Sequence, residues 1–274
     1  MNNAPALIKK CLEKAGLSMD EIDIIAFSRG PGIPNCLRVG SAVARFLSLK
    51  YKKPLVPVNH CIAHIEIGKF ETGCKDPVVV YLSGGNTQIL AFVEGRYRVF
   101  GETIDIAVGN ALDVLAREMG FSMPGGPEIE KLAKRGKWIE LPYVVKGMDV
   151  SFTGILTEAI KKFREGCKPE DVAFSMQEVC FSMLTEISER ALAHTGKDEL
   201  LLVGGVAANK RLREMMKIMC KERGAKFYVV SPKYSSDNGV MIALSGLLAF
   251  QKGLKFEDGI DPKWRVDEVD WVES

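Results

Sequence analysis

The sequence has little histidine and no closely paired cysteines. Only three of its 274 residues are histidines, and its seven cysteines include no C-x-x-C spacing. Neither their number nor their spacing is typical of a disulfide-bonded scaffold, so we expect reduced, mostly buried thiols. The chain also lacks an apolar run as long as a membrane span and a signal-peptide pattern at its start. We therefore expect a cytoplasmic protein without membrane contact.

An excess of charge of one sign is also missing. The formal net charge is only +2, which excludes a strong overall attraction to nucleic acid but permits local basic patches. What is present is ordinary for a globular protein, with 47% hydrophobic and 26% charged residues. A chain of this length can form one large domain or two lobes with a sizeable core.

Helical and strand patterns alternate along most of the chain. Apolar periodicity predicts helices at residues 4–15, 37–49, 210–223 and 238–251. Short apolar runs predict strands at residues 22–27, 54–58, 199–203 and 226–230. Strands followed by helices in this order favour a parallel sheet.

A different pattern begins after residue 76. Three strand-like runs, at residues 78–82, 87–93 and 96–101, predict an antiparallel meander with a glycine turn. Helices then dominate residues 105–195, apart from a break at 123–127 and an irregular stretch at 143–154. Together the patterns predict an α/β protein of two lobes, residues 1–75 and 76–274, in which the C-terminal tail could pack back on the N-terminal lobe.

The most informative residues are His60 and His64, which stand four positions apart. On a helix this spacing places both imidazoles on one face, within reach of a single metal ion. The neighbours of the two histidines are apolar, so the helix should be half-buried. The spacing alone leaves two interpretations open, a metal site and a pair of core histidines.

Three polar or glycine-rich junctions follow predicted strands, where a parallel-sheet protein binds its ligand. In residues 83–87, paired glycines would let backbone N–H groups close on a phosphate, although a plain hairpin turn has the same pattern. In residues 203–209, Asn209 would cap the next helix, either beside an anion or simply in tight packing. In residues 235–239, Asp237 by itself would be interpreted as another helix cap.

Taken together, these motifs closely resemble one family, the tRNA N6-adenosine threonylcarbamoyltransferases, and in particular the archaeal and eukaryotic catalytic subunit of the KEOPS complex. The resemblance is carried by residues 59–66, 81–88, 109–113, 124–127, 146–152 and 204–209, which read NHCIAHIE, YLSGGNTQ, GNALD, PGGP, KGMDVSF and GGVAAN. It implies the two-lobed actin-like, sugar-kinase-like (ASKHA) fold with a nucleotide in the cleft.

The resemblance also implies a metal site and a nucleotide site. The family's metal ligands fall on His60, His64, Tyr81 and Asp237, a nitrogen and oxygen set for one ion, with iron favoured over zinc. Its contacts to an adenylate or ATP fall on Tyr81, Leu82, Ser83, Gly84, Gly85, Asp113, Gly126, Glu130 and Asn209. No catalytic residue is assigned beyond the metal ligands.

The implied activity is transfer of a threonylcarbamoyl group from threonylcarbamoyl-AMP to N6 of the adenosine that follows the tRNA anticodon, with release of AMP. The implied partners are tRNA, a small dimerising subunit and a Bud-type kinase. Two basic runs could contact tRNA, although solvated helix faces are the ordinary explanation of such runs. The runs are Lys131, Lys134, Arg135 and Lys137, and Lys210, Arg211, Arg213 and Lys217.

The start of the chain departs from the family pattern. The family begins with a strand hairpin that carries a glycine-rich phosphate loop, and this sequence has no counterpart, so we expect an incomplete N-terminal lobe. A split gene with a separate N-terminal fragment as a further partner, a truncated chain, or a start chosen too far downstream would each explain the difference. Two alternative functions stay open, a non-catalytic scaffold and a metallopeptidase. The peptidase is disfavoured because Cys61 occupies the place of the glutamate in H-E-x-x-H.

Overall fold

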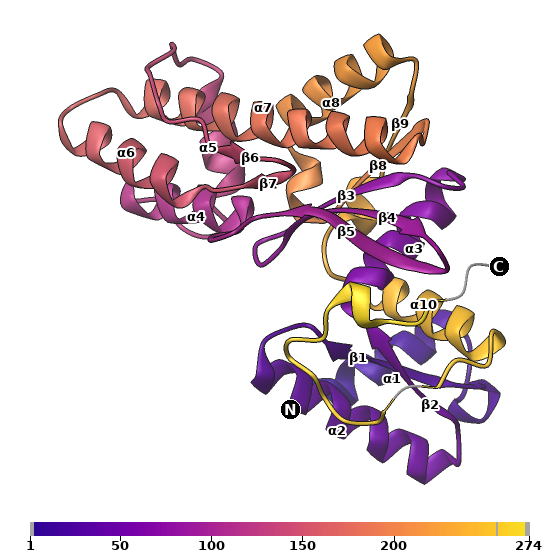
Figure 1. The fold of residues 1–274 in the computed structure, drawn as a ribbon. Coiled ribbons are helices and arrows are strands. Elements are labelled where there is room, and N and C mark those ends of the chain that lie inside the picture. Colours follow the sequence, from indigo (N-terminus) through magenta and orange to yellow (C-terminus); the bar gives the residue numbers. More distant parts are fainter. Residues whose placement is uncertain (1–2, 256, 272–274) are drawn as a thin grey trace. The chain divides into compact units, whose positions relative to one another are not determined.

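The computed structural model describes residues 3–255 and 257–271, which form two compact units. The first unit comprises the described residues of Met1–Ile67, Glu94–Tyr97 and Asn238–Ser274, and the second comprises Gly68–Val93 and Arg98–Asp237. Figure 1 follows the chain through both. Within the described residues, no helix has the combination of length and apolar character that crossing a bilayer requires.

The first unit is built on two parallel strands, β1 (Ile25–Gly30) and β2 (Leu55–Asn59). The long helix α2 (Pro34–Tyr51) connects them, α1 (Ala4–Ala15) precedes them with the short η1 (Met19–Glu21), and α10 (Gly239–Gln251) packs on both strands. Strand β2 leads without a loop into α3 (His60–Thr72).

The predicted strand at 22–27 was partly wrong, because β1 begins at Ile25 and continues to Gly30. Its pairing starts where β2 becomes available, with the Ile25 N–H donating to the Pro54 carbonyl at 2.9 Å. Its far end is held by the C-terminal segment, since the Asp261 N–H donates to the Arg29 carbonyl at 2.9 Å. Apolar residues alone therefore predict where a strand is possible, while the partner decides where it begins.

The larger sheet has the strand order β5-β4-β3-β8-β9. Strands β3 and β4 are antiparallel, whereas β8 is parallel to both β3 and β9. The strands are β3 (Val78–Leu82), β4 (Thr87–Val93), β5 (Arg96–Glu102), β8 (Glu199–Val203) and β9 (Lys226–Val229). The predicted meander and the predicted strands at 78–82, 87–93 and 199–203 are confirmed, and β3 and β8 are buried along their whole length.

The helices of the second unit enclose one apolar core with this sheet. They are α4 (Val108–Glu118), α5 (Gly126–Ala133), α6 (Thr153–Arg164), α7 (Pro169–Thr195), η2 (Gly205–Ala208) and α8 (Lys210–Arg223), and the short α9 (Pro232–Ser235) follows β9. The short helix η3 (Val266–Glu268) belongs to the first unit. The prediction that residues 143–154 are irregular was wrong, because β6 (Val145–Lys146) and β7 (Asp149–Val150) form a small hairpin there. Gly147, at a φ of 65°, makes its turn.

Asp105 ties the start of α4 to the start of α6. Its carboxylate accepts bonds from the Ser151 hydroxyl at 2.6 Å and from the N–H groups of Ile106, Phe152 and Thr153 at 2.7, 2.9 and 3.1 Å. Partial burial favours the neutral acid, but these donors outweigh it and hold the pKa of Asp105 well below its usual range.

We expect Asp105→Asn to lower the free energy of unfolding at neutral pH. The lowered pKa means that the folded state favours the carboxylate, so its contribution is complete above the ordinary pKa of about 3.9 and is lost as pH falls below that value. Urea unfolding of both proteins at several pH values should therefore give a difference that shrinks below about pH 4. Asp20→Asn, at an exposed side chain of the first unit, is the charge-matched control; a difference that grows on acidification would contradict the prediction.

Candidate functional site

His60 and His64 lie on the first turns of α3, as predicted. Their ring centroids are 4.9 Å apart and the ring planes are almost perpendicular, at 86°. His64 is buried and His60 is half-buried. The two imidazoles are therefore one helical turn apart and close enough to bind the same ion.

Asn59 fixes the start of this helix. Its side-chain oxygen accepts the N–H groups of Cys61 and Ile62 at 2.9 and 3.3 Å, and its amide donates to the Trp264 carbonyl at 3.2 Å. Beyond His64 on the same helix, the buried Glu66 carboxylate accepts bonds from Trp271 Nε1 and from the Tyr97 hydroxyl, both at 3.1 Å. The C-terminal segment thus holds the histidine helix on both sides of the His pair.

We expect Asn59→Ala to destabilise the first unit by about 1 kcal/mol, the usual cost of losing a helix N-cap. Because the cap precedes His60 directly, the variant should also bind metal more weakly. Chemical denaturation measures the first effect and metal titration the second. Asn3→Ala, at the start of α1 where the side chain makes no capping bond, is the control; equal losses in both variants would contradict a specific role for Asn59.

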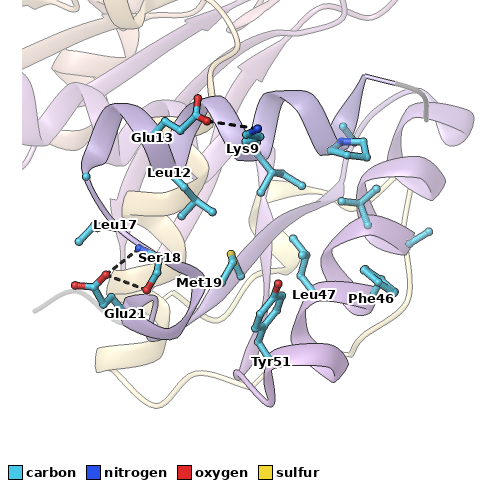
Figure 2. Close-up of a pocket in the computed structure, with 16 residues that line it drawn as sticks. Lys9, Leu12, Glu13, Leu17, Ser18, Met19, Glu21, Phe46, Leu47 and Tyr51 are labelled. Atoms are coloured by element: carbon cyan, nitrogen blue, oxygen red, sulfur yellow. Dashed lines mark hydrogen bonds and ion pairs between the residues drawn. The ribbon is translucent and has the colours of Figure 1, made fainter.

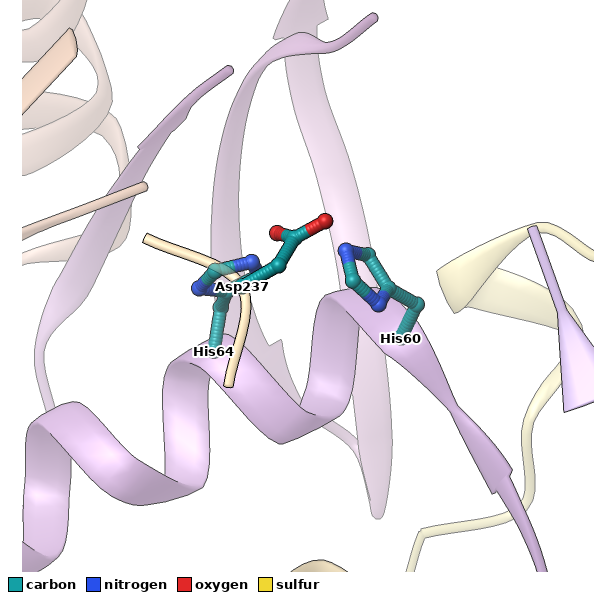
Figure 3. Close-up of side chains that lie close together, drawn as sticks. All are labelled: His60, His64 and Asp237. Carbon is teal, nitrogen blue, oxygen red and sulfur yellow. The ribbon is translucent and has the colours of Figure 1, made fainter. Parts of the chain in front are cut away.

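Asp237 completes a group of three possible metal ligands with the two histidines. It directly precedes Asn238, whose side chain caps α10 by accepting the Met241 N–H at 3.0 Å, and α10 packs on the strand that leads into α3. One ligand atom from each of His60, His64 and Asp237 lies within 4.8 Å of the others. In Figure 3 the Asp237 carboxylate points toward the two rings. Two imidazoles and a carboxylate suit iron or zinc.

Tyr81, the fourth predicted ligand, is the penultimate residue of β3. Its side chain is fully buried, and its hydroxyl accepts a long bond of 3.5 Å from the Asn86 amide. Its role as a ligand stays a prediction.

The second unit contains a pocket of about 330 Å³. Among the predicted nucleotide contacts, Gly84, Asp113, Gly126, Glu130 and Asn209 line it, whereas Tyr81, Leu82, Ser83 and Gly85 do not. Sequence reasoning missed its other lining residues, which are Gly109, Leu112, Pro124, Pro127, Gly205, Val206, Ala208 and Ser236. Most of these residues belong to the motifs GNALD, PGGP and GGVAAN. The motifs therefore indicated which segments line the pocket, although not which further residues in them do so.

Two of the predicted contacts also build the pocket wall. The Asp113 carboxylate accepts the N–H groups of Gly125 and Gly126 at 2.7 and 3.2 Å, and Glu130 accepts the Lys210 N–H at 3.1 Å. Each carboxylate uses one oxygen for these bonds, and the described residues place no hydrogen bond on the other. These second oxygens are suited to accept hydroxyl donors such as those of a ribose.

Asn209 has the predicted capping role. Its side-chain oxygen accepts the N–H groups of Arg211 and Leu212 at 2.9 and 3.1 Å, and its amide donates to Gln177 at 3.0 Å. Both ends of the amide are therefore engaged within the protein, and this residue positions the start of α8 beside the pocket.

The glycines of the GGVAAN motif serve two purposes. Gly204 has a φ of 93°, and a Cβ atom there would lie 2.2 Å from the Leu82 carbonyl oxygen, so only glycine lets β8 end against β3. A Cβ at Gly205 would meet nothing within 4 Å, and the same holds for Gly84, which also lines the pocket. These two glycines keep the pocket open rather than allowing close packing.

A larger groove of about 1000 Å³ lies in the first unit between α1 and α2 (Figure 2). Its lining is mainly apolar and includes Leu12, Leu17, Phe46 and Leu47, with an ion pair between Lys9 and Glu13 at 3.8 Å. None of the predicted site residues lines it. Its size does not make it the better nucleotide site, because its polar groups pair with one another, Lys9 with Glu13 and Ser18 with Glu21, and the rest of the lining is mainly apolar.

Comparison with protein families gives one match over most of the chain. Residues 1–244 match the model of the tRNA N6-adenosine threonylcarbamoyltransferases. A protein of that name from Thermococcus kodakarensis is 58% identical over 97% of this chain and 83% of its own length. The counterpart from Archaeoglobus fulgidus is 54% identical over the same shares. A probable bifunctional tRNA threonylcarbamoyladenosine biosynthesis protein from Methanocaldococcus jannaschii is 54% identical over 98% of this chain but 51% of its own.

Solved structures with a similar fold include HypF proteins. The HypF of T. kodakarensis superposes with a TM-score of 0.69 at 17% identity and covers 89% of this chain and 42% of that one. A full-length HypF in a phosphate- and nucleotide-bound form gives 0.63 at 13% identity, over 79% and 38%. At these identities the likeness concerns the fold alone, which is the predicted α/β, actin-like and sugar-kinase-like class.

Proposed function

The chain belongs to the family of tRNA N6-adenosine threonylcarbamoyltransferases, and from this premise we propose how its residues serve that reaction. The protein is an enzyme that forms N6-threonylcarbamoyladenosine in tRNA. We propose that His60, His64 and Asp237 hold one metal ion and that the pocket of the second unit binds the adenylate of the donor. The ligand atoms within 4.8 Å of one another carry the first part of this proposal.

The donor we propose is threonylcarbamoyl-AMP, and the acceptor is the adenosine that follows the anticodon. The N6 amine attacks the carbamoyl carbonyl carbon, a C–N bond forms, the bond to the AMP phosphate oxygen breaks, and N6 loses a proton. The motifs offer no evident nucleophilic side chain, so direct attack by the base is the simplest pathway. A bound metal ion would supply Lewis-acid polarisation of the carbonyl and a fixed charge for the adenylate.

Iron is the metal we propose, in preference to zinc. Two neutral imidazoles and a carboxylate accept either ion, and Tyr81 as a fourth ligand would add a phenolate. A free phenol with a pKa near 10 stays protonated at neutral pH, so it would bind as a phenolate only beside a metal ion.

The adenylate is proposed for the pocket lined by Gly84, Asp113, Glu130 and Gly205. Its volume of about 330 Å³ lies at the lower end of ordinary small-molecule sites. Asp113 and Glu130 each keep one oxygen for the ribose hydroxyls, and the open space above the two glycines admits the phosphate.

Further partners are proposed from the family resemblance. They are a small dimerising subunit and a Bud-type kinase, in a cytoplasmic KEOPS complex. Support for a second activity alongside this one comes from the relative in M. jannaschii that is named as probably bifunctional and has about twice this chain's length.

Metal removal tests the proposed site. The protein, treated with a chelator and desalted, should release no AMP from threonylcarbamoyl-AMP and tRNA and should form no modified adenosine, and added Fe²⁺ should restore both more fully than Zn²⁺. Full activity of metal-free protein would contradict the metal role. Release of AMP without modified tRNA would contradict the proposal that the tRNA adenosine is the acceptor. Cleavage of a peptide substrate would favour the metallopeptidase.

A further inference from the structure

The segment that follows α5 presents an exposed aromatic side chain among basic ones. Trp138 is 57% exposed, whereas the other two tryptophans, Trp264 and Trp271, are 5% and 3% exposed. Lys134, Arg135 and Lys137 beside Trp138 are not buried either. A single exposed apolar residue is ordinary, but tryptophan together with arginine and lysine is the combination enriched at contact surfaces.

The backbone of this segment is held firmly against α7. The Lys137 N–H donates to the Asp171 carboxylate at 2.7 Å, and the Ile139 N–H donates to the Ser175 hydroxyl at 2.8 Å. At Gly136 a Cβ atom would lie 2.1 Å from the Glu170 carbonyl oxygen, so the backbone touches the helix there. Trp138 lies between two anchored amides, and its exposure therefore does not result from a loose loop.

The neighbouring cations are also free to bind an external anion. Within residues 3–255 and 257–271, Lys134, Arg135 and Lys137 take part in no ion pair. Of the other cations in the two predicted basic runs, Lys131 pairs with Glu128 at 2.7 Å and Arg211 with Glu178 at 2.7 Å, whereas Lys210 and Lys217 are as free of ion pairs among the described residues as these three. What distinguishes the end of the first run is the exposed ring of Trp138 next to its free cations.

We propose that residues 134–138 form a contact surface for unpaired nucleotides of the tRNA substrate, with Trp138 stacking on a base and the three cations binding phosphates. The proposal rests on the action of the enzyme on tRNA described above. Aromatic platforms flanked by Lys and Arg are how proteins hold single-stranded nucleic acid. The target adenosine lies in the anticodon loop, where bases are unpaired and available for stacking. The charge of this surface favours nucleic acid over a peptide or protein ligand, because three cations beside one ring match the phosphates of an unpaired strand.

The fluorescence of Trp138 gives a direct test. Titrating the full chain with an anticodon stem-loop RNA should quench the emission of the exposed tryptophan, whereas a fully paired RNA of the same length should quench it far less. Trp138→Phe should abolish the quenching but retain most of the affinity, and Trp138→Ala should raise the Kd about tenfold or more. Equal quenching by both RNAs, or an unchanged Kd in Trp138→Ala, would overturn the proposal.

The three cations are tested by salt dependence. Lys134→Gln, Arg135→Gln and Lys137→Gln combined should weaken binding and reduce the slope of log K against log salt by about two, at roughly 0.7 for each phosphate that is no longer neutralised. Lys221→Gln, at an exposed lysine of α8, is the control and should leave the slope nearly unchanged. An unchanged slope in the triple variant would show that these are only solvated side chains.

Catalysis and binding are separated by a second comparison. The Trp138→Ala enzyme should show a raised KM for tRNA with kcat retained at saturation, whereas the emission of Asp237→Ala should be quenched normally by RNA although the variant forms no product. If the stem-loop quenches the wild-type enzyme but tRNA is not modified, the proposed reaction fails and the contact surface stands. If Trp138→Ala modifies tRNA with no loss, the contact surface fails alone.

Discussion

Asp237→Ala is expected to lose bound metal and modification activity together. The substitution removes the one carboxylate among the three donors that come within 4.8 Å of one another, and the two imidazoles left of this group, even with Tyr81 as the proposed further ligand, hold an iron ion less tightly. Mutating a residue that only hydrogen-bonds to a metal ligand typically lowers metal affinity or activity by about 10–100-fold. Loss of a metal ligand itself should therefore lower them by at least about 100-fold. Elemental analysis gives the metal content per chain, and nucleoside analysis of the tRNA gives the activity.

The histidines provide both a parallel test and a control. His60→Ala and His64→Ala should reproduce the loss, while His194→Ala should not, because the third histidine lies exposed on α7 and its ring contacts Phe100 instead. Circular dichroism checks that each variant folds. A metal-free Asp237→Ala protein with full activity would refute the metal role. A variant that keeps its metal but is inactive would show that Asp237 acts on the substrate and is not needed to bind the metal ion.

Filling the pocket of the second unit is expected to abolish nucleotide binding without unfolding the protein. Gly84→Leu and Gly205→Leu each place a side chain into a space of about 330 Å³, and neither glycine has a positive φ. Since a Cβ at either position meets nothing within 4 Å, the unfolding midpoint should change little. A clash that costs about 1.4 kcal/mol already weakens binding tenfold, so calorimetric titration with AMP should give a Kd at least about ten times higher.

A third glycine separates a pocket effect from a general one. Gly154 lies in the first turn of α6, outside the pocket lining, and a Cβ there also meets nothing within 4 Å. Gly154→Leu should therefore bind AMP as the wild-type protein does. Normal AMP binding by Gly84→Leu and Gly205→Leu would show that the nucleotide does not bind in this pocket. A large loss of stability in either variant would mean that the glycine is required for folding.

Local patterns predicted those features that depend on a few neighbouring residues. Strand β8 was found because a run of buried apolar residues ends in glycines, and the Asn209 cap because its acceptor lies two and three residues from its donors. The hairpin at Val145–Val150 was missed because two-residue strands carry almost no periodic signal. The start of β1 was misplaced because its partner, and not its own composition, determines the pairing.

The sequence by itself determined the family, most helices and strands, and the pair His60 and His64, since motifs and periodicity are local and survive without knowledge of packing. The family resemblance assigned Asp237 to that pair, but only the tertiary structure brings its carboxylate within 4.8 Å of the histidine nitrogens. The tertiary structure alone also decided that one oxygen of Asp113 is used by the pocket wall and that Trp138 stays exposed on an anchored backbone. The reason is physical: these facts depend on which distant segments pack together, and a contact between residues far apart in the chain leaves no mark in the residues next to either of them.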